Sequence, residues 1–202
     1  MRPEMIEKMV DKRVQVLVAH HDDESLYFGG LLTEIRELAR VKITVMTAPA
    51  PGRPDTHTRL DSLKKVCWVL GATYSAYDLK DFPPIIENTR HVVHQQIDKA
   101  RDIVKADLFG FQPDVILTHN WFGEPNPGYV GGHPVHAMVY DAVLAESSCD
   151  IFVNAVGLNS YDYEIEYDIG RKKILLDCYA PNWKPDVYPF AYNPERYLEV
   201  KR

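Results

Sequence analysis

The chain has 202 residues, of which 46% are hydrophobic and 26% are charged. These proportions exclude intrinsic disorder. The length is within the range that one hydrophobic core can serve, so we expect a single domain over residues 1–202. The 23 basic and 29 acidic residues give a formal net charge of −6. That balance lacks the positive field that nucleic-acid binding requires, so no nucleic-acid partner is expected.

The sequence also lacks the usual signals for membranes and secretion. No apolar run approaches the roughly 20 residues that span a bilayer, so no membrane span is expected. The first residues, MRPEMIEKMVDKR, are charged throughout, without the apolar stretch of a secretory signal. Three cysteines (Cys67, Cys149 and Cys178) are an odd number without close pairing, which favours a reducing compartment. We therefore expect a soluble, cytoplasmic protein.

The first part of the chain alternates strand and helix patterns. Residues 14–19 (VQVLVA) form a near-continuous apolar run, which is typical of a strand buried on both faces. Residues 25–40 repeat apolar side chains at helical spacing, and residues 42–47 (KITVMT) return to β-branched strand character. This strand–helix–strand order predicts two parallel strands joined by a right-handed crossover.

Later segments continue the alternation. We expect helices over residues 58–70, 89–108, 134–146 and 171–179, and strands over residues 72–77, 115–119, 151–156 and 161–169. The tail from residue 181 contains four prolines and many aromatics, and we expect it to wrap the surface as ordered coil. The whole pattern predicts an α/β fold with a Rossmann-like, doubly wound, mostly parallel sheet and helices on both faces. Ligands of such folds bind at the carboxyl ends of the strands.

Histidines and carboxylates cluster directly after the first predicted strand, in the sequence AHHDDE over residues 19–24. His20 and Asp23 are three residues apart, a spacing that lets both face one point. Carboxylates at a helix start can simply cap the helix and complement its dipole. Capping accounts for one carboxylate, but poorly for three together with two histidines. We therefore interpret this turn as part of a metal site.

A second cluster, GGHPVH over residues 131–136, opens the predicted helix over residues 134–146. His133 and His136 are also three residues apart, and the fold brings them to the same sheet edge as the first cluster. A lone histidine at a helix start is usually a structural hydrogen bonder. A catalytic zinc ion takes three nitrogen or oxygen ligands and one water. His20, Asp23 and His136 supply that set and leave Asp22 as a general base.

These segments together resemble the PIG-L/LmbE family of zinc-dependent N-deacetylases. The first family motif reads AHPDDE and is followed by two glycines, here Gly29 and Gly30, and a later motif reads HPDH. The resemblance covers about residues 14–180, which form the core of the expected domain. It implies one zinc or other divalent ion per chain, held by His20, Asp23 and His136.

The resemblance also implies roles for residues around the metal. Asp22 matches the general base, and His133 matches the histidine that stabilises the oxyanion or protonates the leaving amine. Arg59 matches an arginine that contacts the substrate, and Tyr129 is the nearest candidate for a family tyrosine. His119 is expected to contact the substrate, in a supporting rather than a chemical role. A degenerate C-terminal motif is expected to place Tyr179 at the border of the site.

Two departures from the family pattern concern the motif histidines. His21 replaces the proline of the first motif, and Val135 replaces the aspartate between the two later histidines. In the family that aspartate can support the first of the two histidines. Without it, we expect His133 to have a lowered pKa. The alternative is that Glu124, brought in by the preceding loop, already supports His133.

The resulting functional expectation is a zinc-dependent hydrolase. It removes an acetyl or other acyl group from an N-acyl amino sugar of the N-acetylglucosamine type, or from a conjugate of one. One alternative is a zinc amidase acting on a larger amide, such as a thiol conjugate or an acylated antibiotic. Another is a non-catalytic metal- or nucleotide-binding α/β module, encouraged only by Val135. The sequence leaves homo-oligomer formation open.

Overall fold

The computed structural model describes residues 3–48, 56–81, 96–124, 132–179 and 193–201. Within them, seven strands form one sheet: β1 (Arg13–Val18), β2 (Arg40–Thr47), β3 (Thr73–Leu79), β4 (Val115–Thr118), β5 (Asp150–Asn154), β6 (Tyr163–Ile165) and β7 (Glu195–Glu199). Their order across the sheet is β3-β2-β1-β4-β5-β7-β6. The strands β3, β2, β1, β4 and β5 run parallel, whereas β7 is antiparallel to both of its neighbours.

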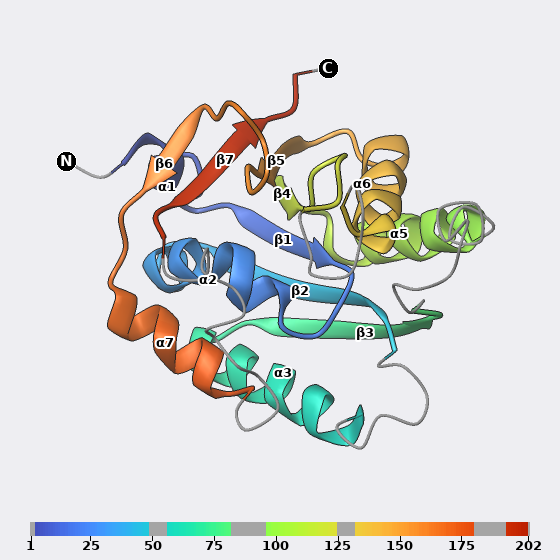
Figure 1. Cartoon of the computed structure of the whole chain (residues 1–202), viewed down its shortest axis with the longest axis horizontal. Helices are drawn as coiled ribbons and strands as arrows, with labels where there is room; N and C mark the ends of the chain where they lie inside the picture. The colour runs from blue at the N-terminus through green and yellow to red at the C-terminus, as the bar shows by residue number, and fades with distance from the viewer. Residues whose placement is uncertain (1–2, 49–55, 82–95, 125–131, 180–192, 202) are drawn as a thin grey trace.

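The centre of the sheet is the pair β1 and β4 (Figure 1). The chain moves outward from β1 to β3 on one side, then returns to β4 on the other side of β1. Val14 of β1 is paired with Val41 of β2 and with Val115 of β4, and all three side chains are buried. The carboxyl ends of β1 and β4 therefore form a topological switch point, the place where such sheets bind ligands.

Helices cover both faces of the sheet, which confirms the predicted α/β fold. They are α1 (Glu4–Glu7), α2 (Asp23–Ile35), α3 (Thr56–Leu70), α5 (Ile97–Phe111), α6 (Pro134–Glu146) and α7 (Ile169–Asp177). One buried cluster joins the sheet to α1, α2, α3 and α7, and a second joins it to α5 and α6. Figure 1 shows α2, α3 and α7 at the lower left of the sheet, and α5 and α6 at its right. No helix among the described residues is long and apolar enough to cross a membrane.

The C-terminal tail differs from its prediction. Residues 195–199 are not surface coil: they form β7, which lies between β5 and β6. Glu195 and Tyr197 are buried and Arg196 between them is exposed, the alternation of a strand with one buried face. This pairing joins segments distant in sequence, so the local proline-rich composition gave no sign of it. The predicted helix over residues 25–40 also ends earlier, at Ile35, because β2 begins at Arg40.

Candidate active site

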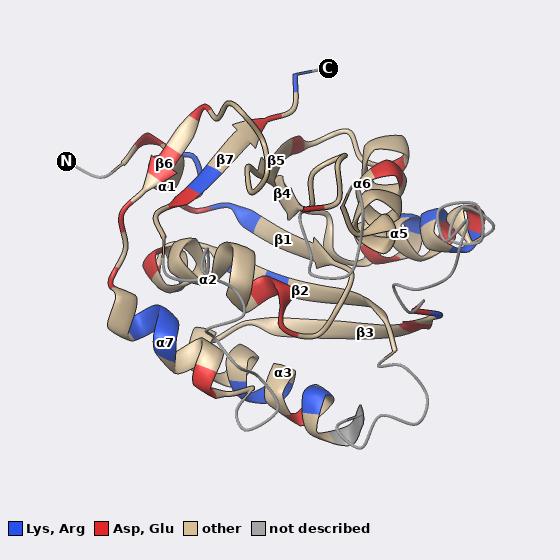
Figure 2. Ribbon diagram, viewed as in Figure 1, with Lys and Arg blue, Asp and Glu red and all other residues tan. Residues whose placement is uncertain are grey.

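The candidate site lies at the carboxyl ends of β1 and β4. β1 leads through an acidic turn into α2, which Figure 2 shows as a red segment at the start of that helix. β4 is followed along the chain by α6. Together these segments contribute His20, Asp22, Asp23, His119, Glu124, His133 and His136. The structure thus brings the two sequence clusters to one place.

The acidic turn has an unusual backbone. Asp22 has a φ of 120°, a region that residues other than glycine rarely adopt. Its carbonyl oxygen accepts hydrogen bonds from the N–H groups of Ser25 (3.0 Å) and Leu26 (2.9 Å), which starts α2. The Asp23 carboxylate folds back to accept the N–H of His20 at 2.7 Å. The turn therefore directs the Asp23 side chain toward the histidine that precedes it.

Three atoms that could bind a metal ion lie close together at the centre of the site. Nδ1 of His20 lies 3.0 Å from Nε2 of His136 and 3.3 Å from Oδ2 of Asp23, and these last two atoms are 3.4 Å apart. Ligands about 2.0–2.2 Å from a tetrahedral ion are separated by roughly 3.3–3.6 Å. His20, Asp23 and His136 could therefore hold one divalent ion between them.

Two further histidines flank this cluster. The ring of His136 is stacked between His119 (centroids 3.8 Å apart, 14° between planes) and His133 (4.4 Å, 10°). Donor atoms of Asp23, His119 and His136, and those of His20, His133 and His136, also lie within 4.8 Å of one another. Stacked imidazole rings present their nitrogen lone pairs in parallel planes, whereas the His20 ring is tilted by 51° to that of His136, so lone pairs of these two rings can converge.

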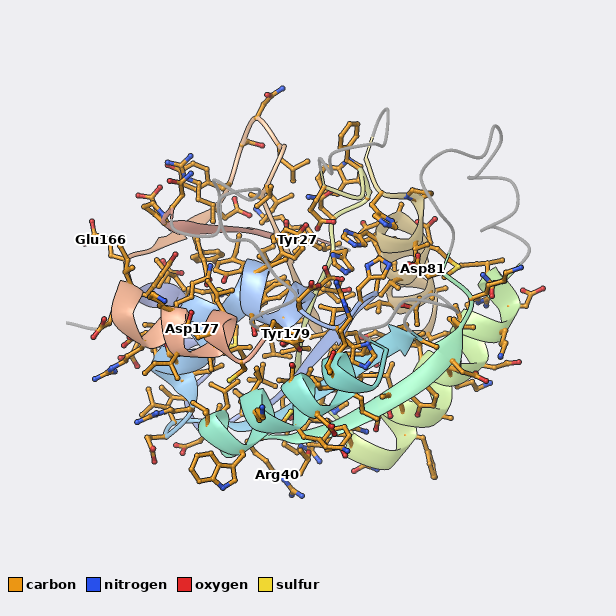
Figure 3. The ribbon with its side chains drawn as sticks, turned by 60° about the horizontal axis from the view of Figure 1, so that its bottom comes forward. Tyr27, Arg40, Asp81, Glu166, Asp177 and Tyr179 are labelled. Atoms are coloured by element: carbon orange, nitrogen blue, oxygen red, sulfur yellow. The ribbon has the colours of Figure 1, made fainter. Side chains whose placement is uncertain are left out.

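Neighbouring charges set the protonation of the cluster. Burial disfavours the charged form of His20, but Asp81 and Asp23 outweigh it and raise its pKa to about 10. Asp81, just beyond β3, lies 3.1 Å from Nε2 of His20 through Oδ1 (Figure 3). Burial would raise the pKa of Asp23, but His136 and His119 hold it well below the usual value. Asp23 therefore stays ionised, the form that binds a metal.

Asp22 has a different environment from Asp23. Burial raises the pKa of Asp22 to about 7, Arg59 opposes this shift, and Asp23 and Glu24 add to it. Nη1 of Arg59 donates to Oδ2 of Asp22 at 3.2 Å and to the carbonyl oxygen of His21 at 3.0 Å. A carboxylate with a pKa near neutrality can accept and return a proton. Arg59, predicted to contact a substrate, here contacts the predicted base.

His133 caps the N-terminus of α6. Its Nδ1 accepts the N–H of Val135 at 3.3 Å, and burial together with His136 and His20 lowers its pKa. Burial is the leading cause of this shift, ahead of the two histidines. The side chain of Val135 is fully buried in the core shared with α5 and α6. His133 is therefore a neutral ring whose proton is on Nε2, because Nδ1 acts as an acceptor.

The loop after β4 closes back on the start of α6. The N–H of His133 donates to the carbonyl oxygen of Gly123 at 2.6 Å. A Cβ atom at Gly123 (φ 84°) would lie 2.2 Å from the carbonyl oxygen of His133, so this position requires glycine. The next residue, Glu124, has a φ of 45° and is fully buried. The closure thus drives a carboxylate into the site.

Glu124 is the residue whose role the sequence analysis missed. Its Oε2 lies 2.7 Å from Nδ1 of His136 and 3.1 Å from Nδ1 of His119. Its Oε1 accepts the N–H of Asn120 at 3.1 Å and a hydrogen bond from the side chain of Asn154. Burial would raise the pKa of Glu124, but His119 and His136 lower it to about 2. The sequence suggested His133 as the partner of Glu124, whereas the carboxylate contacts His136 and His119 instead.

The remaining predicted residues have distinct positions. His119 is fully buried; its Nε2 accepts the N–H of Ala19 at 3.0 Å and lies 3.2 Å from Oδ2 of Asp23. These contacts fit a supporting role, and they place its ring nitrogens against protein groups rather than a substrate. Tyr179 is buried, and its hydroxyl donates to Oε1 of Glu24 at 2.8 Å, so it borders the acidic turn as predicted (Figure 3). Tyr129 lies outside the described residues.

Comparison with known proteins agrees with this arrangement. A family model described as PIG-L, GlcNAc-PI de-N-acetylase, matches residues 15–146, which is more than half of the chain. The chain belongs to the PIG-L family. Both histidine clusters of this PIG-L protein lie inside the matched residues. No curated protein matches the sequence.

Several solved structures share the fold of this PIG-L protein. The zinc-inhibited form of teicoplanin deacetylase is 16% identical, with a TM-score of 0.71 over 94% of this chain and 98% of that one. N,N'-diacetylchitobiose deacetylase from Pyrococcus horikoshii is 15% identical, with a TM-score of 0.66 over 98% and 89%. GalB, the 4-carboxy-2-hydroxymuconate hydratase of Pseudomonas putida, is 12% identical, with a TM-score of 0.66 over 95% and 97%. At these identities the likeness establishes the fold alone.

Proposed function

We propose that this protein is a metal-dependent N-deacetylase that hydrolyses the amide of an N-acyl amino sugar or of its conjugate. The observation that carries the proposal is the pairing of two different carboxylates at one turn. Asp23 is held ionised among histidine nitrogens, whereas Asp22, beside it, has a pKa of about 7. One suits a metal ligand and the other a general base, the division of labour that metal-assisted hydrolysis needs.

His20, Asp23 and His136 would hold the metal through Nδ1, Oδ2 and Nε2, and His20, whose pKa is about 10 in the metal-free protein, would release a proton on binding. Two imidazole nitrogens and one carboxylate oxygen are donors that suit zinc. A zinc-inhibited form is known for the related teicoplanin deacetylase, so we propose zinc and include other divalent ions in the assays. When bound, such an ion polarises the amide carbonyl and lowers the pKa of its water.

The protein groups would then move the protons. Asp22 accepts the proton of the attacking water and delivers it to the leaving nitrogen, because a pKa near 7 permits both steps. Arg59 fixes the Asp22 carboxylate through its contact with Oδ2. His133 donates a hydrogen bond from Nε2 to the developing oxyanion. Its lowered pKa makes it a neutral hydrogen-bond donor rather than the acid that protonates the amine.

The substrate class rests on the family and its relatives. The family description names a GlcNAc-PI de-N-acetylase, and one structural relative deacetylates N,N'-diacetylchitobiose. We therefore propose an N-acetylglucosamine-type substrate, with Arg59 and Tyr129 as its contacts. Teicoplanin deacetylase keeps an acylated antibiotic as the second candidate substrate. Cytoplasmic location remains a prediction.

The test is release of a free amine by zinc-loaded protein. The panel contains N-acetylglucosamine, N,N'-diacetylchitobiose, an N-acetylglucosamine conjugate and an N-acylated glycopeptide, with Asp22→Asn as the inactive control. We expect one of the sugar substrates to be deacetylated by the wild type and not by the variant. Amine release from the glycopeptide alone would move the substrate to the second candidate. An unsaturated hydroxy acid is assayed separately for the addition of water. Hydration of that acid, with no amine released from any amide, would overturn the proposal in favour of a hydratase.

A further inference from the structure

Three buried side chains from the C-terminal part of the chain contact the middle of α2. They are Lys172 on α7 and Glu195 and Tyr197 on β7, and we call them the C-terminal clamp. The side chains of Lys172 and Glu195 are 0% and 4% exposed, and Tyr197 is fully buried. Figure 1 shows the start of β7 on one side of α2 and α7 on the other. All three residues lie outside the family match over residues 15–146.

The clamp binds the backbone of α2 rather than its side chains. Glu195 accepts the N–H of Gly30 through Oε1 at 2.7 Å and the N–H of Leu31 through Oε2 at 2.8 Å. Lys172 donates from Nζ to the carbonyl oxygen of Leu26 at 2.8 Å and to Oε1 of Glu195 at 2.7 Å. The ion pair thus hydrogen-bonds to two backbone N–H groups and one backbone carbonyl in the middle of α2.

These backbone groups are partners of one another in an ordinary α-helix. The N–H of Gly30 would bond the carbonyl of Leu26, and the N–H of Leu31 would bond that of Tyr27. The hydroxyl of Tyr197 lies 3.3 Å from the carbonyl oxygen of Tyr27. Both members of two consecutive helical hydrogen bonds therefore have a partner in the clamp.

The two glycines singled out in the sequence make room for this contact. A Cβ atom at Gly30 would lie 2.3 Å from Cδ1 of Tyr167, and one at Gly29 would lie 3.2 Å from Cγ of Lys172. The Tyr167 ring in turn lies 5.0 Å from Nζ of Lys172. A side chain at residue 30 would displace Tyr167 and, through it, the cover of the ion pair. The glycine pair is therefore part of the clamp site.

The clamped residues of α2 are connected to the candidate active site. Leu26, whose carbonyl binds Lys172, donates its N–H to the carbonyl oxygen of Asp22 at 2.9 Å. The ring of Tyr27 packs edge-on against His119 and His136, with centroids 5.7 and 6.0 Å apart. A change in the angle of α2 at Gly30 would therefore move the first turn, where the two working carboxylates lie.

We propose that Lys172 and Glu195 are positioning residues of the site. By hydrogen-bonding to backbone groups in the middle of α2, they fix the direction of its first two turns and so orient Asp22 and Asp23 toward the histidines. The effect on metal binding rests on the proposed function, because it takes Asp23 to be a ligand. The effect on the orientation of α2 does not depend on the proposed function, and it can be measured without metal.

The test replaces the ion pair by an apolar pair, Lys172→Met with Glu195→Leu. Exchanging both partners leaves no unpaired buried charge and removes both side-chain contacts with the backbone of α2. The control is Lys173→Met with Asp177→Leu, which removes an exposed ion pair (2.8 Å) from α7, the helix that carries Lys172. In the metal-free proteins, we expect the double variant to shift the amide resonances of Asp22 and Asp23, and the control to leave them in place. Unshifted resonances in a folded double variant would overturn the proposal.

Zinc titration of the same proteins adds the functional readout. We expect the affinity of the double variant for Zn²⁺ to fall roughly tenfold to a hundredfold, as loss of supporting contacts does elsewhere, and the control to match the wild type. Equal affinities would overturn the positioning role. A wild type that binds no zinc would instead contradict the proposed function, while the metal-free resonances still report on α2. If the double variant does not fold, Tyr197→Phe is measured in the same way, and smaller shifts of the Asp22 and Asp23 resonances are expected. Unchanged resonances in that variant would also overturn the proposal.

Discussion

Glu124 and His136 form a fully buried pair, with Oε2 of the carboxylate 2.7 Å from Nδ1 of the imidazole. The contact places the proton of a neutral His136 on Nδ1, because the carboxylate can only accept. Nε2 then carries the lone pair, and it lies 3.0 Å from Nδ1 of His20 and 3.4 Å from Oδ2 of Asp23. A carboxylate behind a histidine in this way fixes both the tautomer and the ring orientation of a metal ligand.

The first prediction concerns that pair. Glu124→Gln keeps an oxygen for His136 but removes the charge, and we expect the Zn²⁺ affinity to fall about tenfold. Glu124→Ala also removes the hydrogen bond, so its loss of affinity is expected to be larger, up to about a hundredfold. Calorimetric titration of the metal-free proteins measures both values. Glu37→Gln, on an exposed side chain, is the control. An affinity unaltered in Glu124→Ala would mean that His136 needs no support.

The second prediction separates the candidate ligand sets. If His20, Asp23 and His136 hold the ion, wild-type protein contains about one divalent ion per chain, and His20→Ala and His136→Ala lose most of it. His119→Ala keeps a bound ion with weakened affinity, because its ring is stacked on His136 rather than aimed at the centre. Metal analysis after dialysis measures the content, and circular dichroism checks folding. Loss of the ion from His119→Ala but not from His20→Ala would assign the other set.

Much of this site could be predicted because its signals are local. The strand β1, the helix α6 and the two clusters with residues three apart are each set by a few neighbouring positions. A parallel sheet then brings strand ends together by topology alone. The contact between Glu124 and His136 was beyond such reasoning, since it depends on a left-handed loop residue and on the closure at Gly123.

The strand β7 and its contact with α2 escaped prediction for a related reason. The partners of Glu195 are backbone N–H groups of α2, more than 160 residues earlier in the chain. Backbone groups carry no sequence signature, and a buried glutamate reads like a surface one until its partner is known. Gly29 and Gly30 gave the only trace, and they were noted as part of a motif rather than as room for Tyr167 and Lys172.

The third prediction divides the work of the two carboxylates. Asp22→Asn is nearly isosteric and should keep the metal, yet lower kcat by a factor on the order of 10² to 10⁴, as loss of a general base does. Asp23→Asn should weaken metal binding, because it replaces the ionised oxygen between the histidines. Steady-state kinetics at saturating zinc, together with metal titration, separate the two effects. The same behaviour in both variants would contradict this division.

The fourth prediction concerns the pH dependence of stability in metal-free protein. The pKa of Asp22 is raised in the fold to about 7 from an ordinary value of 3.8, so the folded state binds its proton more tightly than the unfolded state. Asp22 therefore lowers the free energy of unfolding as the pH rises from about 4 to about 7. We expect the stability of Asp22→Asn relative to the wild type to increase over this range and then level off. Urea denaturation at several pH values measures the difference. A constant difference would show that the Asp22 carboxyl group titrates normally.

The fifth prediction concerns Val135, where the family has an aspartate. Its side chain is fully buried in the core shared with α5 and α6, and only its backbone N–H reaches His133. We therefore expect Val135→Asp to place an unpaired carboxylate among apolar side chains instead of supporting His133. The free energy of unfolding should fall by about 3 kcal/mol or more, a loss typical of buried unpaired charge.

Val135→Ala is the matched control, because it removes the same methyl groups without adding a charge. A buried aspartate has a raised pKa, so its destabilising effect is present at high pH and diminishes as the pH falls and the carboxyl group takes up a proton. The stability gap between Val135→Asp and Val135→Ala should therefore narrow from pH 8 to pH 5, measured by urea denaturation. A gap of the same size throughout, with a raised pKa for His133 by NMR, would show that the new carboxylate reaches His133 after all. The motif would then work in this chain as it does in the family, with Val135 as a simple loss of that support.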